Sequence, residues 1–133
     1  ASAGNATDFG DAINVKSDAG GASSNTRMVA GGGHSGGTTE DSSKSPSIEY
    51  ITIASTGNAT DFGDLTVGRN SVAGVSNSTR AVFQGGGGWA NGATARSTLD
   101  YVTIATTGNA TDFGDQASEM YSSGSVGNAH GGL

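Results

Sequence analysis

The chain contains no cysteine, one proline and one tryptophan, and only six of its 133 residues are lysine or arginine. Without cysteine it can form neither a disulfide framework nor a thiolate metal site. The net charge is −6 and the basic residues are spread along the sequence. This argues against nucleic-acid binding, because phosphate neutralisation needs clustered Lys and Arg. No apolar run approaches the length needed to span a bilayer, so we expect no membrane insertion.

Glycine is abundant instead, with 24 residues, and part of it marks a repeat. The octapeptide Gly-Asn-Ala-Thr-Asp-Phe-Gly-Asp occurs at Gly4–Asp11, Gly57–Asp64 and Gly108–Asp115, so its copies begin 53 and then 51 residues apart. Two further segments recur in the same register, Thr26–Val29 as Thr79–Val82 and Ile48–Ala54 as Leu99–Ala105. A period near fifty residues is typical of propellers and solenoids, whose units cannot bury a core alone.

The register of the repeat predicts a single array with four parts. Residues 1–11 are the tail of a repeat, residues 12–64 and 65–115 are two complete repeats, and residues 116–133 are the start of a third. Units without neighbours expose sheet faces and edges, which invite association. We therefore expect the partners to be other copies of the chain or the rest of a larger repeat protein.

An alternation of period two predicts strands rather than helices. β-Branched and aromatic residues dominate Leu99–Ile104, and its odd- and even-numbered side chains should point to opposite faces. Arg80–Gln84, Asn70–Val75 and Ala59–Leu65 are the other expected strands of the pattern. Four short antiparallel strands in about fifty residues are the content of one propeller blade. The predicted fold is all-β, with about two and a half four-stranded blades in this chain.

The order of residues along the repeat resembles the kelch repeat. A basic residue opens the first strand, paired glycines end an apolar strand, an acid–tyrosine pair follows, and Thr-Gly with an aromatic residue closes the unit. Phenylalanine stands where the kelch family has tryptophan. The resemblance implies kelch-like propeller blades, in which glycines let inner strands crowd near the axis and one aromatic residue packs against the next sheet. The positions concerned are Lys16, Arg69, Gly32, Gly85, Glu49, Tyr50, Asp100, Tyr101, Phe9, Phe62 and Phe113.

The octapeptide itself resembles repeats in virion and tail-fibre proteins of marine bacteriophages, particularly phages of cyanobacteria. The resemblance includes Ser78–Arg80, which precedes a glycine run, and the strand Tyr101–Ala105. It implies an extracellular or virion-associated module that is not an enzyme and that is structural or binds a host surface.

Motifs that suggest catalysis have simpler structural interpretations. The Asp-Phe-Gly string lacks the His-Arg-Asp loop and strand lysine of kinases, and no Gly-Lys-Ser/Thr follows the glycine runs as it would in a phosphate loop. The octapeptide offers only two carboxylates, so turn capping is favoured over a calcium site, and the two histidines occupy non-equivalent repeat positions. We expect no enzyme activity, no cofactor and no metal.

Ligand binding is expected in the loops that do not repeat. Trp89 is the only tryptophan and lies in such a loop, where an exposed ring would form a stacking platform for a sugar. Packing beneath its own loop is the alternative. The candidate ligand contacts are Trp89, Asn91, Arg96 and His34.

A second expectation concerns recurring charges. Arg27 and Arg80 recur just before the glycines, and Glu49 and Asp100 recur in the strand that follows. This matched recurrence predicts an ion pair between strands or between blades.

The sequence therefore supports two hypotheses. The first is a phage tail-fibre or capsid-decoration module that binds host-surface carbohydrate through its variable loops. The second is a purely architectural protein that assembles into a fibre or oligomer without a ligand.

Overall fold

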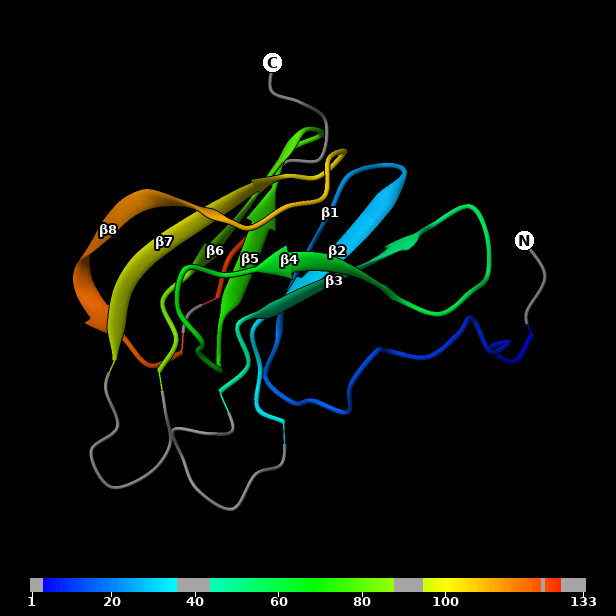
Figure 1. Ribbon diagram of the computed structural model, residues 1–133, viewed down its shortest axis with the longest axis horizontal. Helices are drawn as coiled ribbons and strands as arrows, with labels where there is room; N and C mark the ends of the chain where they lie inside the picture. Colours follow the sequence, from blue (N-terminus) through cyan, green and yellow to red (C-terminus); the bar gives the residue numbers. More distant parts are fainter. Residues whose placement is uncertain (1–3, 36–43, 88–94, 123, 128–133) are drawn as a thin grey trace.

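The computed structural model describes residues 4–35, 44–87, 95–122 and 124–127, and all regular structure within them is β (Figure 1). Two four-stranded antiparallel sheets follow one another along the chain, each with its strands in sequence order. The first sheet consists of β1 (Gly20–Ser23), β2 (Arg27–Gly31), β3 (Ser47–Thr52) and β4 (Thr60–Asp64). The second consists of β5 (Ala73–Ser76), β6 (Arg80–Gln84), β7 (Arg96–Thr103) and β8 (Thr111–Met120). The all-β prediction with four antiparallel strands per sheet is confirmed, and neither sheet closes on itself.

The expected alternation is visible in β7 and its continuation. Asp100, Val102 and Ile104 are buried, while Tyr101 between them is half-buried and Thr103 is exposed. Successive side chains of a strand point to opposite faces, so one face of β7 supplies the core and the other does not. The alternating sequence pattern thus assigned the two faces of β7 correctly.

The two sheets share a single apolar layer, to which they contribute opposite faces. Val29, Ile48 and Phe62 come from the first sheet, and Phe83 and Val102 from the second. Val29 has its repeat equivalent at Val82, which lies on the outer face of the second sheet, across β6 from buried Ala81 and Phe83. The contact is therefore head-to-tail, because each sheet presents a different face to its neighbour.

The first strands of the two sheets approach each other closely. Ser76 Oγ donates a hydrogen bond to the carbonyl of Ser23 at 2.7 Å and accepts one from the Ser23 amide at 3.1 Å. A Cβ on Gly74 would overlap the Gly21 backbone. Ser125 Oγ in turn donates to the Gly74 carbonyl at 2.6 Å, so the segment 124–127 lies against β5 much as β5 lies against β1. Glycine is required here by backbone contact.

A fully buried ion pair fixes the second sheet. Arg69 Nη1 lies 2.7 Å from Asp100 Oδ2, and both side chains are 0% exposed. The Arg69 guanidinium also donates to the carbonyl oxygens of Gly85, Phe83 and Val67. Asp100 additionally accepts hydrogen bonds from the hydroxyl and the amide of Thr66. This arrangement satisfies the requirement that buried charges be paired and hydrogen-bonded.

The first sheet contains the equivalent pair with different residues. Lys16 Nζ lies 3.1 Å from Glu49 Oε1, and the amide of Ile13 donates to Glu49 Oε2 at 2.9 Å. Lys16 and Glu49 occupy the repeat positions of Arg69 and Asp100. The ion pair thus recurs in both sheets, with lysine and glutamate in the first where the second has arginine and aspartate.

The predicted pairing of Arg27 with Glu49 and of Arg80 with Asp100 is wrong. Arg27 lies opposite Thr52 whereas Glu49 lies opposite Ala30, so the two side chains point to opposite faces. The same offset separates Arg80 from Asp100. Both acids pair instead with the basic residue that precedes the first strand of their own sheet.

Removing the carboxylate of the second pair should strongly destabilise the fold. We expect Asp100→Ala to lower the free energy of unfolding by about 3–5 kcal/mol, because it leaves the Arg69 guanidinium buried without its partner. Glu49→Ala is the matched comparison and should cost less, since the side chains of Lys16 and Glu49 are 5% and 9% exposed whereas those of Arg69 and Asp100 are 0% exposed. The flexible lysine stem can also carry its ammonium group toward solvent more easily than a guanidinium that is hydrogen-bonded to three carbonyls. Urea unfolding followed by circular dichroism measures both, and an equal or smaller loss for Asp100→Ala would contradict this account.

Candidate functional site

The three copies of the octapeptide are hydrogen-bonded to one another in sequence. The Gly57 amide donates to the carbonyl of Phe9 and the Ala59 amide to that of Asp11, each at 2.8 Å. The Asp11 amide donates in return to Asn58 Oδ1 at 3.0 Å. We call this set of three hydrogen bonds a rung. It joins the Phe-Gly-Asp end of one copy to the Gly-Asn-Ala start of the next.

A second rung repeats the same three bonds. The Gly108 amide donates to the carbonyl of Phe62 and the Ala110 amide to that of Asp64, both at 2.7 Å. The Asp64 amide donates to Asn109 Oδ1 at 3.0 Å. The outer edge of β4 is thereby covered by the residues that lead into β8. Covering an edge in this way protects it from adventitious strand pairing.

The second glycine of the octapeptide allows this close approach. A Cβ on Gly10 would overlap the carbonyl of Gly57, and one on Gly63 would overlap that of Gly108. Both glycines also have positive φ angles, of 145° and 143°. Any other residue would therefore both strain the backbone and push the two copies apart.

The acids of the octapeptide act partly as the expected turn caps. Asp8 Oδ1 accepts a hydrogen bond from the Gly10 amide at 3.1 Å, and Asp112 Oδ1 accepts one from the Gly114 amide at 2.9 Å. Both bonds span two residues, which is the usual geometry of a carboxylate that stabilises a local turn. Within the described ranges, no three His, Asp or Glu side chains gather where they could hold a metal ion.

Phe62 sits in a β-bulge of β4. Its neighbours Asp61 and Gly63 pair with the consecutive residues Glu49 and Ile48, so Phe62 is the extra residue of β4. Phe113 has the same position in β8. The bulge aims the ring along the face of the sheet, where it meets the tyrosine of the adjacent strand.

Each sheet carries a stack of three side chains built in this way. The inner stack is Arg27, Tyr50 and Phe62: the guanidinium lies 4.2 Å from the tyrosine ring centre, and the two rings meet edge-to-face at 5.9 Å. The outer stack is Arg80, Tyr101 and Phe113, with distances of 4.4 and 5.8 Å. Such contacts contribute beyond simple burial of area. The two stacks have nearly identical internal geometry.

Their surroundings differ. Phe62 is 2% exposed beneath the second sheet, and Arg27 donates to the carbonyl of Ile104 in that sheet at 2.8 Å. Phe113 is 52% exposed and Arg80 is exposed as well. The outer stack thus has the form of a contact surface whose internal counterpart is covered.

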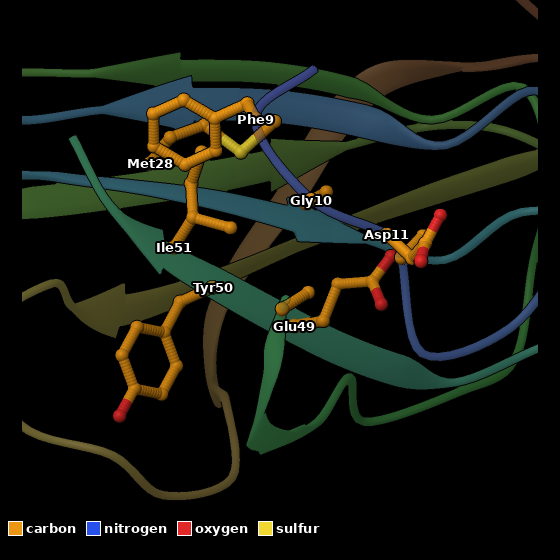
Figure 2. Close-up of a pocket in the computed structure, with 10 residues that line it drawn as sticks. Phe9, Gly10, Asp11, Met28, Glu49, Tyr50 and Ile51 are labelled. Atoms are coloured by element: carbon orange, nitrogen blue, oxygen red, sulfur yellow. The ribbon is translucent and has the colours of Figure 1, made fainter. Parts of the chain in front are cut away.

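The opposite outer face of the molecule is hollowed (Figure 2). A cavity of about 230 Å³ lies between the segment Phe9–Ala12 and the outer face of the first sheet. Phe9, Met28 and Ile51 lie at one end of it, and Asp11 and Glu49 at the other (Figure 2). Its lining is chiefly apolar, so it is suited to an apolar side chain rather than to a polar small molecule.

A second hollow, of about 340 Å³, adjoins the outer stack. It is more polar, and its lining combines one tyrosine ring with hydroxyl and amide groups. The residues that line it are Tyr101, Val102, Thr103, Thr106, Thr107, Gly108, Asn109 and Thr111. An aromatic ring beside several hydrogen-bonding side chains is chemically suited to a sugar.

The residues predicted to bind ligand are only partly described. Trp89 and Asn91 lie outside the described residues. Arg96 opens β7 and is half-buried, and its carbonyl accepts from Gln116 Nε2 at 3.5 Å. His34 is half-buried and lies after β2, outside the named strands, where its backbone exchanges two hydrogen bonds with Ser17. Arg96 thus belongs to the second sheet, whereas His34 bridges to Ser17 and Lys44 beside the first sheet.

Gly32 and Gly85, which belong to the paired glycines of the repeat, both lie in contact with Arg69. Gly32 has a φ of +74°, and a Cβ there would lie 2.6 Å from the Arg69 carbonyl. Gly85 supplies the carbonyl that accepts from Arg69 Nε at 2.8 Å. The resemblance to the kelch repeat had placed glycines where strands crowd together, and Gly32 does lie at such a contact.

Sequence reasoning missed the rungs, whose one signal was the exact repetition of the asparagine.

The architecture defines the chain as an all-β protein of two stacked, four-stranded antiparallel sheets. Comparison with protein-family models finds no match, and a search of curated proteins finds none either. In the described part of the chain there is no helix long and apolar enough to cross a membrane.

Asn58 and Asn109 should stabilise the fold, because each accepts a backbone hydrogen bond in a rung. We expect Asn58→Ala and Asn109→Ala each to lower the free energy of unfolding by about 1 kcal/mol and the melting temperature by a few degrees, because each leaves a backbone amide without its acceptor. Asn5→Ala is the matched control: all three asparagines are exposed, but Asn5 belongs to neither rung, so its loss should leave melting unchanged. Thermal melts of the three variants measure this, and equal effects would show that the asparagines act outside the rungs.

Proposed function

We propose that this chain is a non-enzymatic structural module whose four-stranded units stack as the blades of a propeller do, and which completes its stack with further units. The head-to-tail contact between the two sheets carries the proposal. A contact that joins two different faces leaves one face of each kind uncovered at the ends of the stack. More units can therefore be added without any new kind of interface.

The exposure of equivalent residues supports this proposal. Phe113 is 52% exposed where Phe62 is 2% exposed. Ile53 is 43% exposed where its equivalent Ile104 is 1%, and Met28 is 37% exposed where Ala81 is 0%. Large apolar residues are thus exposed at both ends of the stack, in the positions that are buried at its centre. Exposed apolar surface of this kind usually marks an interaction site.

The location follows from the sequence resemblance. The octapeptide resembles repeats of virion and tail-fibre proteins of cyanobacterial phages, which supports a place in a fibre or a capsid decoration outside the cell. The rungs fit this role, because an extended array gains one set of identical contacts for every unit that is added. The partners are accordingly further copies of the chain or further units of a larger repeat protein.

Self-association should depend on the outer stack. We expect the sedimentation coefficient of the chain to rise with concentration, and Phe113→Ala to suppress this rise while changing the free energy of unfolding by less than about 0.5 kcal/mol. Phe62→Ala is the matched control and should cost about 3–5 kcal/mol, because it empties a buried site. Sedimentation velocity and urea unfolding measure the two effects. A wild-type chain that remains monomeric at every accessible concentration would refute assembly from copies of the chain.

A second function, recognition of host-surface carbohydrate, is favoured by the polar hollow beside Tyr101. The sequence had placed sugar binding on the loop of Trp89, whereas the hollow combines an aromatic ring with threonine and asparagine side chains. Sugar recognition commonly uses this combination of a flat apolar surface and several hydrogen-bonding groups. The two locations make different predictions.

A glycan array separates the two locations. If the hollow binds sugar, Thr107→Val should reduce binding about 10-fold or more, because it removes a hydroxyl partner from the ligand and retains the shape of the side chain. Trp89→Ala should then bind as the wild type does. The reverse result would place recognition on the Trp89 loop, and wild-type chain that binds no glycan would leave the architectural function alone.

A further inference from the structure

We propose that the edge of β8 at Phe113–Asp115 binds Gly4–Ala6 of a second copy of the chain, so that the series of rungs continues from one molecule into the next. The inference deepens the proposed function, on which it rests, by naming the residues that join two copies. It assigns the incoming residues the same three hydrogen bonds that the two internal rungs contain.

The acceptor half of a rung is complete at β8. Phe113, Gly114 and Asp115 repeat Phe62, Gly63 and Asp64 in sequence and in their pairing with the adjacent strand. β8 is the last strand of its sheet, so its outer edge faces away from β7. Among the described residues, none comes within 4 Å of the place where a Cβ on Gly114 would lie, whereas at Gly63 the Gly108 carbonyl fills that place. The space that an incoming backbone needs is therefore present.

The donor half of a rung is complete at the other end of the molecule. Gly4, Asn5 and Ala6 repeat the residues that donate in both internal rungs, and all three are exposed. No described atom lies within 4 Å of the Cβ position of Gly4. The amides of Gly4 and Ala6 can donate to the carbonyls of Phe113 and Asp115, respectively. The side-chain oxygen of Asn5 can accept from the Asp115 amide.

The two halves cannot meet within one molecule. Figure 1 shows β8 at one end of the pair of sheets and the N-terminal segment toward the other end. A contact between two different surfaces at opposite ends adds molecules in a chain rather than closing a symmetric dimer. The occupant is identified by continuity: the octapeptide is identical in all three copies, and the same contact occurs twice inside the molecule.

A peptide titration tests the site directly. The probe is the synthetic octapeptide Gly-Asn-Ala-Thr-Asp-Phe-Gly-Asp, added to the isotopically labelled full chain at a concentration where the chain is monomeric. Three hydrogen bonds and one partly covered ring form a small contact, so we expect a dissociation constant on the order of 1 mM, which NMR can follow. The amide signals of Phe113, Gly114 and Asp115 should shift. Shifts at Gly57–Ala59 in their place, or no shifts at all, would overturn the proposal.

A substituted peptide checks the role of the asparagine. Replacing Asn by Ala in the probe removes the acceptor for the Asp115 amide, and binding should weaken about 2- to 10-fold. A scrambled peptide of the same composition should not shift these signals. Unchanged binding by the alanine peptide would overturn the assignment of a rung.

Substitutions in the full chain separate this proposal from the proposed function. Asn5→Ala should leave melting unchanged and weaken self-association about 2- to 10-fold, measured by sedimentation velocity. Asn58→Ala is the matched control, because its rung is internal and its loss should lower melting instead. Gly114→Ala should also abolish association, since its Cβ would occupy the space of the incoming Gly4 carbonyl.

The outcomes are distinguishable. If the wild type associates and both Asn5→Ala and Gly114→Ala associate equally well, the rung between copies is refuted while stacking as a function stands. If the wild type does not associate but the peptide binds at Phe113–Asp115, a second copy is refuted as the occupant. Assembly that is sensitive to Asn5 and Gly114, together with unchanged melting of Asn5→Ala, supports the proposal.

Discussion

The structure depends on one shared apolar layer between two sheets, because neither sheet has enough apolar residues for a core of its own. Only 33% of the chain is hydrophobic. Val29, Ile48 and Phe62 have no second apolar layer in their own sheet, and they are buried because Phe83 and Val102 cover them from the next one. A unit of this kind gains its stability at the junction with a neighbour, as units of repeat proteins do. The residues that form the junction therefore decide both the fold and the surface left at its ends.

The buried ion pair and the paired glycines reinforce that junction through the backbone. Arg69 precedes β5 and donates to two carbonyls in and just after β6 as well as to Asp100 in β7, so a single side chain connects three parts of the second sheet. The carbonyl of Arg69 accepts from the Gly33 amide at 2.9 Å and thereby reaches the first sheet. Such a residue specifies the relative position of the sheets more than it adds net stability, because desolvation offsets much of the attraction between buried charges.

The sequence predicted what depends on local pattern and missed what depends on register between strands. The strands near residues 80–84 and 99–104 and the division of the β7 side chains between two faces follow from alternation. The predicted Arg27–Glu49 pair failed because Arg27 lies opposite Thr52 and Glu49 lies opposite Ala30, a register that the order of residues along the repeat does not reveal. The rungs were missed because most of their hydrogen bonds are between backbone groups, which have no residue signature. The arrangement of further units around an axis likewise depends on contacts that lie outside two sheets.

The outer edge of β4 is covered by the next octapeptide, and this contact explains why the octapeptide is repeated so strictly. An uncovered sheet edge pairs with any compatible strand, so proteins cover or interrupt their edges. Here the edge of β4 is covered by the start of the next octapeptide, and the same residues then pass directly into β8. One segment thus closes the edge of one unit and begins the outer strand of the next. Both duties constrain the same few positions: Gly63 and Gly108 must pass close together, Asn109 must accept from Asp64, and Phe62 must remain in the bulge. A substitution in one copy is felt by two units, and this coupling is a sufficient physical reason for three identical copies in a chain whose loops differ.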